Sequence, residues 1–231
     1  MAALYMVATP IGNLRDITLR ALDVLREVDA IACEDTRHSL KLLNSHGIKK
    51  SLIPCHAHNE QKAAQRICGM LDDGKSVAFI SDAGTPGISD PGSVLVRAVR
   101  DAGHPVVPIP GPSAMAAILS VSGFPGKRVI FEGFLSPKGG RRKNQLKNLL
   151  ELGDAFIVYE SPFRIAKLLA DLEQLCDEID DNRRVLCGRE LTKSHEELLE
   201  GSAGEIRENL ENRPSIKGEF AVLVSGPVKR P

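Results

Sequence analysis

Short apolar runs alternate with longer amphipathic segments along the first half of this 231-residue chain. The apolar run Val77–Ile80 is continuous, as is typical of a strand that is covered on both faces. In the longer segments, apolar residues recur every three or four positions, which favours helices. Strands that alternate with helices pair in parallel, and the helices cover both faces of the sheet. The pattern therefore predicts an α/β fold with a mainly parallel first sheet.

The second half repeats this rhythm more loosely. The proline- and glycine-rich segment 108–112 separates the halves and indicates a domain junction, so we predict an N-terminal α/β domain over residues 1–112 and a C-terminal α/β domain over residues 113–231. Strands are expected at residues 4–8, 30–33, 51–55, 77–80, 106–109, 129–134, 155–159, 185–188 and 220–224. Helices are expected at residues 36–45, 59–72, 93–102, 113–121, 145–152, 163–176 and 206–212, with an earlier one capped by Asp16.

The composition excludes several classes of protein. Thirty basic side chains balance thirty acidic ones, so bulk charge does not favour coating of nucleic acid. The start resembles no signal peptide and no long apolar run follows, so we expect a cytoplasmic protein without a membrane segment. The five cysteines are scattered and form no C-x-x-C pair, which argues against disulfides and zinc. His56 and His58 lack a third nearby ligand, so no metal is expected.

The segment SDAGTPGISDPG at residues 81–92, here called the donor loop, is the most unusual part of the sequence. It follows a buried strand, and ligands of open α/β sheets bind beyond the carboxyl ends of strands, where glycines permit close approach. It matches neither common phosphate-binding motif, and Asp82 and Asp90 would repel a phosphate. S-adenosylmethionine offers an amino group, hydroxyls and a positive centre, all of which suit these carboxylates. The plainer alternative is a turn in which Asp90 caps a helix that begins at Pro91.

Further motifs follow one another across nearly the whole chain. They are ATPIGNLRDIT (8–18), CEDTR (33–37), the donor loop, PGPSA (110–114), FEGFL (131–135), YESPFR (159–164), RELTK (189–193) and KGE (217–219). With these motifs the chain resembles the tetrapyrrole-methylase superfamily, the class III S-adenosylmethionine-dependent methyltransferases. Within that superfamily it resembles the ribosomal RNA small subunit methyltransferase I branch.

The resemblance implies two α/β/α domains, the second with a mixed sheet, and S-adenosylmethionine as methyl donor in the cleft between them. It implies 2′-O-methylation of a cytidine ribose in 16S, small-subunit ribosomal RNA, acting on the RNA or the 30S subunit, and a homodimer. Many relatives continue into a C-terminal helical segment, whereas this chain ends at Pro231. That departure puts in doubt any RNA contact that the segment makes.

The resemblance also assigns the donor-binding residues. In the N-terminal domain it implies a first loop beneath the donor and a donor loop that faces its methionine and ribose parts. The domain junction is expected to close around the donor, and two strand positions of the C-terminal domain are expected near its adenine. The residues are Pro10, Ile11, Gly12, Asp82, Gly84, Thr85, Pro112, Ser113, Ala114, Tyr159 and Ala221.

A basic segment without acidic residues lies between residues 136 and 148. In a neutral chain this is a local concentration of positive charge, and each phosphate contact steepens the salt dependence of RNA binding. A solvated surface is the alternative. We expect Gly139-Gly140 to make the segment adaptable. The expected RNA-binding residues are Lys138, Arg141, Arg142 and Lys143, with Lys147 in the same segment.

A ribose hydroxyl is a poor nucleophile, so a base or a polarising cation would assist the reaction. Of the charged residues in the motifs, Glu190 and Lys193 are the preferred catalytic residues, because RELTK places charge beside a strand end. The other candidates are Glu34, Asp35, Arg37, Glu160, Arg164 and Glu196.

Two other functions remain open from the sequence. A methyltransferase that acts on carbon atoms of a corrin or other tetrapyrrole precursor would share the fold and the donor. A catalytically silent, RNA-binding ribosome-assembly factor would need the basic segment but not an intact donor loop.

Overall fold

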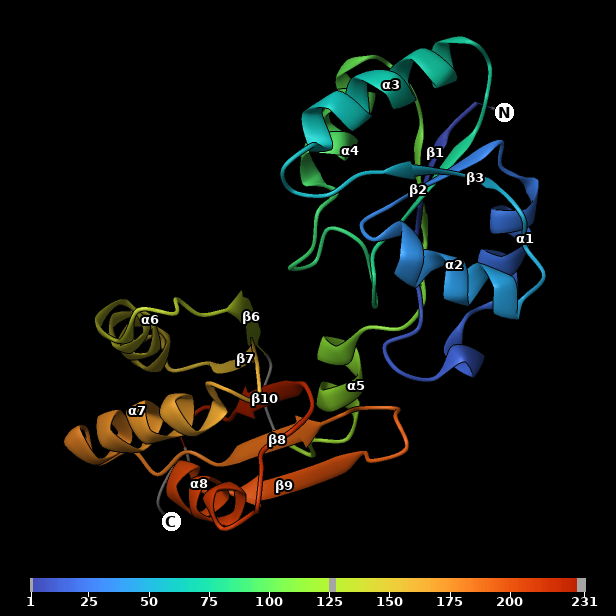
Figure 1. Ribbon diagram of the computed structural model, residues 1–231. Coiled ribbons are helices and arrows are strands. Elements are labelled where there is room, and N and C mark those ends of the chain that lie inside the picture. Colours follow the sequence, from blue (N-terminus) through green and yellow to red (C-terminus); the bar gives the residue numbers. More distant parts are fainter. Residues whose placement is uncertain (1, 125–127, 228–231) are drawn as a thin grey trace. The chain divides into compact units, whose positions relative to one another are not determined.

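The computed structural model describes residues 2–124 and 128–227. The chain divides into two compact units, Met1–Ser113 and Ala114–Pro231, and each unit contains a five-stranded sheet. Figure 1 shows the helices and strands of both units with their labels.

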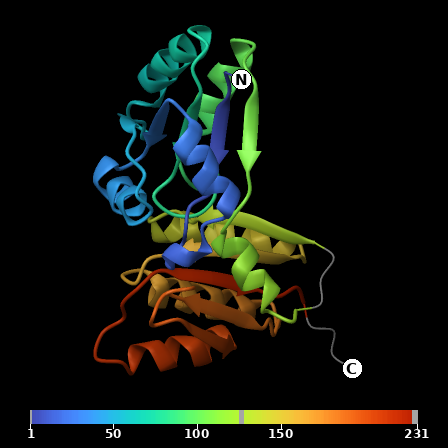
Figure 2. The ribbon, with the colours of Figure 1, turned by 90° about the vertical axis from the view of Figure 1, so that its right-hand side faces the viewer.

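The sheet of the first unit is entirely parallel. Its strands are β1 (Leu4–Val7), β2 (Ala30–Cys33), β3 (Ser51–Pro54), β4 (Val77–Ile80) and β5 (Val106–Ile109). They are ordered β3-β2-β4-β1-β5, and every neighbouring pair is parallel. Figure 2 shows β5 beside β1 at the edge of the sheet. An edge position tolerates Pro108, which has no amide hydrogen to donate to a neighbouring strand.

Helices cover both faces of this sheet, as the continuous apolar strands predict. The helices are α1 (Leu19–Glu27), α2 (Thr36–Ser45), α3 (Glu60–Asp72) and α4 (Ser93–Asp101), with a short 3-10 helix, η1 (Leu14–Asp16). On one face, Ile67 of α3 and Leu95 of α4 pack with Phe79 of β4. On the other face, Leu25 of α1 and Leu43 of α2 pack against the sheet. These two cores hold β1 and β4 rigidly between them, and both strands lead into predicted donor-binding loops.

The second unit has a mixed sheet. Its strands are β6 (Val129–Phe134), β7 (Ala155–Glu160), β8 (Val185–Arg189), β9 (Glu197–Gly201) and β10 (Phe220–Val224). They are ordered β6-β7-β10-β8-β9, in which β6 and β7 are parallel and the other pairs are antiparallel. The parallel first sheet and mixed second sheet confirm the fold class predicted from the sequence.

The described residues of the second unit form four helices, which also lie on both faces of its sheet. They are α5 (Ala114–Ser120), α6 (Gly139–Glu151), α7 (Ile165–Glu178) and α8 (Ala203–Glu211). Leu146 of α6, Leu169 of α7 and Ile206 of α8 share one core with β7, β8 and β10. Ile118 of α5 packs on the opposite face, against Leu223.

Several element boundaries differ from the prediction. Thr18 caps α1 through a hydrogen bond from the amide of Ala21, so the expected cap at Asp16 is wrong. Helix α6 begins at Gly139, six residues before the predicted start at 145, so Gly139-Gly140 is the first turn of a helix and not an adaptable loop. Strand β9 was not predicted at all.

Candidate functional site

The loops after β1, β2, β4 and β5 meet at one edge of the first sheet, because parallel strands all end on the same side. Hydrogen bonds join these loops directly. The hydroxyl of Thr9, after β1, donates to the carbonyl of Ser81, after β4, at 3.2 Å. The amide of Asp35, after β2, donates to Oδ1 of Asp82 at 3.1 Å, and the hydroxyl of Thr85 donates to the carbonyl of Pro112, after β5, at 3.1 Å. The four strand ends therefore form one connected seat.

Gly84 is at the centre of this seat. It forms a two-way backbone bridge with Thr9, in which N···O distances are 2.9 and 3.1 Å. Its φ angle is 80°, a conformation that residues with a side chain rarely adopt. A Cβ at this position would lie 3.2 Å from Cγ2 of Ile11 and 3.6 Å from the carbonyl oxygen of Pro112. The structure thus brings three predicted donor-binding segments into contact around one glycine.

Acidic side chains surround the seat. Burial raises the pKa of Asp90 to about 6, and the nearby charge of Asp82 adds to this effect, although a hydrogen bond with Ser81 opposes it. Burial also raises the pKa of Glu34, as do the charges of Asp82, Asp90 and Asp35. A surplus of negative potential of this kind disfavours a phosphate and favours a ligand with a positive centre.

Glu60, which the sequence analysis did not single out, supports the end of the donor loop. It is only 7% exposed, and its Oε1 accepts hydrogen bonds from the amides of Gly92 at 2.8 Å and Leu95 at 3.0 Å. This carboxylate satisfies the first amides of α4, which begins at Ser93. The helix starts at Ser93, as the expected range 93–102 has it, and the alternative of a helix that begins at Pro91 with Asp90 as its cap is wrong. No sequence signal identifies Glu60, because its contact spans 32 residues.

The remaining predicted donor residues of the first unit lie in the same loops. Pro10 is half-buried, and Gly12 is exposed in the first loop. Ser113, half-buried, ends the unit directly after Pro112. The seat has a glycine that admits close approach, hydroxyl and backbone groups, and carboxylates at its rim. These groups fit a ligand with the hydroxyls and the positive charge of S-adenosylmethionine.

In the second unit, Tyr159 and Ala221 are direct neighbours across β7 and β10. The ring of Tyr159 makes edge contacts with Phe131 and Phe134, at centroid distances of 5.1 and 5.7 Å. Its hydroxyl accepts a hydrogen bond from the amide of Met115 at 2.9 Å, beside the predicted donor residue Ala114 at the start of α5. Tyr159 and Ala221 thus share one face of the second sheet, and Ala114 adjoins a residue that is bonded to Tyr159.

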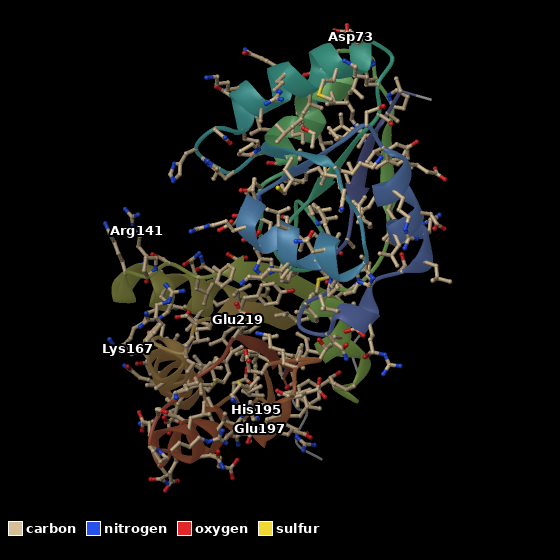
Figure 3. The ribbon with its side chains drawn as sticks, turned by 45° about the vertical axis from the view of Figure 1, so that its right-hand side comes forward. Asp73, Arg141, Lys167, His195, Glu197 and Glu219 are labelled. Carbon is tan, nitrogen blue, oxygen red and sulfur yellow. The ribbon has the colours of Figure 1, made fainter. Side chains whose placement is uncertain are left out.

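Glu190 and Lys193 form an ion pair in the loop after β8. The Nζ of Lys193 lies 2.7 Å from Oε1 of Glu190 and 3.0 Å from Oε2 of Glu219, which Figure 3 labels. Burial alone would raise the pKa of Glu190, but hydrogen bonds from Lys193 and the amide of Glu219 hold it below its usual value. Burial alone would lower the pKa of Lys193, but its bonds to both carboxylates raise it. At neutral pH the lysine is therefore a cation and not a base.

Arg142 is the one predicted RNA-binding residue whose placement contradicts the prediction. Its side chain is only 7% exposed, and two of its nitrogens lie 2.7 Å from Oδ2 of Asp171 on α7. A guanidinium that is buried to this extent is not accessible to a phosphate. We therefore assign Arg142 to the packing of α6 against α7, and not to an RNA surface.

The other predicted cations remain accessible. Lys138 and Arg141 are exposed at the start of α6, and Figure 3 shows Arg141 directed away from the unit. Lys143 is half-buried and bonded to Gln174 at 2.7 Å. Phe163 of the YESPFR motif, expected as the first residue of a helix, is instead 88% exposed in the turn before α7, which begins at Ile165.

Within residues 2–124 and 128–227, no group of three or more histidine, cysteine or carboxylate side chains is arranged to hold a metal ion. Over the same residues, every helix is too short or too polar to cross a membrane.

Comparison with known proteins relates nearly the whole chain to methyltransferases. Residues 3–207 match the family model "Tetrapyrrole (Corrin/Porphyrin) Methylases". The chain is 47% identical to ribosomal RNA small subunit methyltransferase I of Borrelia garinii over 96% of its length and 98% of that protein. It is 45% identical to the protein of the same name from Thermotoga maritima over 98% of the chain and 99% of the relative. For the Pasteurella multocida protein the identity is 47%, over 98% of this chain and 80% of the relative.

The fold is also that of solved methyltransferase structures. A cobalt precorrin-4 methyltransferase superposes with a TM-score of 0.70 and 14% identity, covering 97% of this chain and 95% of that one. A uroporphyrin-III C-methyltransferase from Thermus thermophilus gives a TM-score of 0.64 at 18% identity, covering 97% and 94%. At such low identities these structures establish the fold alone.

Proposed function

We propose a reaction for this chain on the basis of its family. The chain belongs to the tetrapyrrole (corrin/porphyrin) methylase family, and within it to the ribosomal RNA small subunit methyltransferase I family. It transfers a methyl group from S-adenosylmethionine to the 2′-hydroxyl of a cytidine ribose in small-subunit ribosomal RNA. The proposal rests on the intact seat around Gly84. The φ angle of Gly84 is 80°, and Ile11 and Pro112 lie so near that a Cβ would contact both. A silent assembly factor would have no need of such a seat.

The residues of the seat have distinct roles in donor binding. Asp82 accepts from the amide of Asp35 with one oxygen, and its carboxylate is placed to bind an amino group or hydroxyls of the ligand. Gly84 leaves room for the ligand, and Thr85 ties the loop to Pro112. S-adenosylmethionine, when bound, supplies a methyl group that is activated by a positively charged sulfur. The protein's main contribution is then to hold the hydroxyl and the methyl group in line.

On the acceptor side, we propose Lys193 as a cation that stabilises the negative charge that develops on the ribose oxygen as the hydroxyl proton passes to water, the methyl group is transferred to this oxygen, and S-adenosylhomocysteine leaves. Its two carboxylate partners, Glu190 and Glu219, keep it protonated and fix its position. A protonated lysine cannot remove a proton, so electrostatic stabilisation is the role that its pKa permits. Lys138 and Arg141, both exposed, and the partly accessible Lys143 would contact phosphates of the RNA.

Two measurements test the proposal. Calorimetry should detect stoichiometric binding of S-adenosylmethionine to the purified chain. Radiolabelled donor should then transfer its methyl group to small ribosomal subunits that lack the modification, and nuclease digestion should yield a 2′-O-methylated cytidine. Binding of the donor without transfer to subunits or to their naked RNA would refute the RNA assignment. A homodimer and a cytoplasmic location belong to the same proposal and are supported by the family alone.

We expect Asp82→Ala to weaken donor binding by about 1.5–3 kcal/mol, which corresponds to about 10- to 150-fold, because a charge-assisted hydrogen bond is lost. Asp82→Asn separates the two functions of this side chain. It retains an oxygen for the amide of Asp35 but removes the charge, so it should keep the wild-type stability and still bind the donor weakly. Calorimetry measures the affinity, and wild-type affinity in both variants would contradict the role given to Asp82.

We expect Lys138→Ala with Arg141→Ala to weaken binding to ribosomal subunits and to lower the salt slope of that binding by up to about two units. Donor affinity should stay within about twofold, since Lys138 and Arg141 are exposed surface residues that are not among the residues assigned to the donor. Arg97→Ala with Arg100→Ala removes two cations from α4 instead and serves as the matched control. The measurement is a titration with subunits over a range of salt. Equal salt slopes for the two double variants would show that the start of α6 is only a solvated surface.

A further inference from the structure

Two phenylalanine side chains are exposed at one edge of the second sheet. Phe163, in the turn after β7, is 88% exposed, and Phe134, the last residue of β6, is 56% exposed. Burial of a phenylalanine ring stabilises a fold, and both positions forgo much of that stabilisation. A single exposed apolar residue is ordinary, whereas neighbouring ones mark a surface that contacts a partner.

The two rings belong to segments that are bonded to each other. β6 and β7 are parallel, so both end at the same edge of the sheet, and Phe134 is the register partner of Tyr159 near the end of β7. Arg164, which follows Phe163, donates from Nη2 to the carbonyl of Leu135 at 3.4 Å. Leu135 in turn follows Phe134, so this bond holds together the two segments that carry the exposed rings.

The fold holds this edge in place. The register of β6 shifts after Phe131, and the resulting bulge lets Phe131 and Phe134 both contact the ring of Tyr159. The Nε of Arg164 lies 2.7 Å from Oε1 of Glu160, whose side chain is fully buried. An edge that is fixed in advance loses little conformational freedom when a partner binds.

Positive charge adjoins the two rings. Lys138 and Arg141 are exposed at the start of α6, and Lys167 is exposed in the first turn of α7. Figure 3 shows Arg141 and Lys167 directed outward on the same side of the second unit. Within residues 129–141 and 160–167, Glu132 is the single exposed carboxylate against these three cations. The edge is therefore complementary to a partner with negative charge.

A single strand of RNA combines both properties, because each nucleotide carries a phosphate and a flat base. Unpaired bases stack on aromatic side chains, whereas the bases of a double helix stack on one another and offer no free face. We propose, on the basis of the proposed function, that Phe134 and Phe163 are a stacking surface for unpaired bases of the ribosomal RNA. Lys138, Arg141 and Lys167 then contact the phosphates of the same strand.

Phe163→Leu tests the proposal because leucine keeps an apolar side chain and removes the flat ring. We expect it to weaken binding to small ribosomal subunits and to an unstructured oligocytidylate by about fivefold or more. Phe134→Leu should act in the same direction, whereas Phe163→Tyr keeps a ring and should bind like the wild type. Fluorescence anisotropy measures the affinities. The thermal midpoint of Phe163→Leu should not change, since the side chain is exposed.

Three further measurements distinguish stacking from other contacts. An RNA duplex of the same length should bind equally to the wild type and to Phe163→Leu, because it offers no free base. The salt slope of oligocytidylate binding should also be equal in these two proteins, since no cation is removed. Ile179→Ala is the matched control. Ile179 is 52% exposed at the opposite end of α7, so this variant should bind RNA like the wild type.

Three results would overturn the proposal. The first is wild-type affinity for both RNA probes in Phe163→Leu and in Phe134→Leu. The second is weaker binding of S-adenosylmethionine by Phe163→Leu, which would assign the ring to the donor. The third is altered sedimentation of Phe163→Leu, which would assign the ring to a contact between copies of the chain. Failure of the proposed function is a different outcome, in which the wild type binds subunits yet transfers no methyl group to them.

Discussion

Gly84→Val should abolish methyl transfer and weaken donor binding at least about 100-fold, or about 2.7 kcal/mol. Two effects combine at this position. A side chain at φ 80° strains the backbone by roughly 1–2 kcal/mol, and a Cβ would already lie 3.2 Å from Ile11, before the two methyl groups of valine are added. The seat must then open, and the space that would receive the donor is filled. Calorimetry and a transfer assay measure the two losses.

Gly74→Val separates these effects. Gly74 has nearly the same φ angle, 81°, but a Cβ there meets nothing within 4 Å. This variant should share the backbone strain, and therefore a similar part of the stability loss, while donor binding stays within about twofold because the site is distant. Donor binding that falls equally in both variants would mean that general destabilisation, and not the seat, is responsible.

Arg142→Ala should destabilise the second unit by about 3–5 kcal/mol, as is typical when one partner of a buried ion pair is removed. The carboxylate of Asp171 is 12% exposed, and its only other cation is Lys143 at 3.6 Å among the described residues, so it would be left largely uncompensated. Denaturant unfolding followed by circular dichroism measures the loss. Arg141→Ala, at the exposed neighbouring position, should change stability by no more than about 0.5 kcal/mol.

The double variant Arg142→Met, Asp171→Leu removes the charged pair as a whole. Apolar replacement of a buried pair is often neutral, so most of the stability lost in Arg142→Ala should return. RNA affinity should then equal that of the wild type, since the guanidinium does not face the RNA. Weak RNA binding by this stable double variant would show that Arg142 belongs to the RNA-binding surface, in spite of its burial.

The sequence predicted the elements that depend on local patterns. β4 is a continuous apolar run, and α2 has regular apolar spacing, so both were predicted with the bounds that the structure gives. The donor loop was recognisable because its glycines and aspartates are close together in the sequence. Its partners in the seat were assigned by resemblance to a family, since the Thr9–Ser81 contact spans 72 residues.

The sequence failed where distant contacts outweigh local preference. Glycine disfavours helices, so Gly139-Gly140 was expected to be an adaptable loop, yet the Arg142–Asp171 pair and the core around Leu146 hold a helix there. β9 begins with Glu197, a residue type that favours a loop over a strand in a sequence-based prediction. In the structure Glu197 is paired with Arg213 and Arg189. Hydrogen bonds from these two arginines lower the pKa of Glu197 to about 2, although its partial burial acts in the opposite direction. Charge compensation of this kind is visible only in three dimensions.

The long-range hydrogen bonds of the seat have a consequence for the order in which the protein folds during its synthesis. Thr9 emerges from the ribosome early, but its partner Ser81 follows 72 residues later, and Pro112, the partner of Thr85, follows after a further strand and helix. Closing such long loops is slow compared with forming local helices. A growing chain therefore completes most of the first sheet before it possesses a place for the methyl donor. The seat around Gly84 is complete only with the last residues of the first unit, and it then precedes the donor positions expected in the second unit.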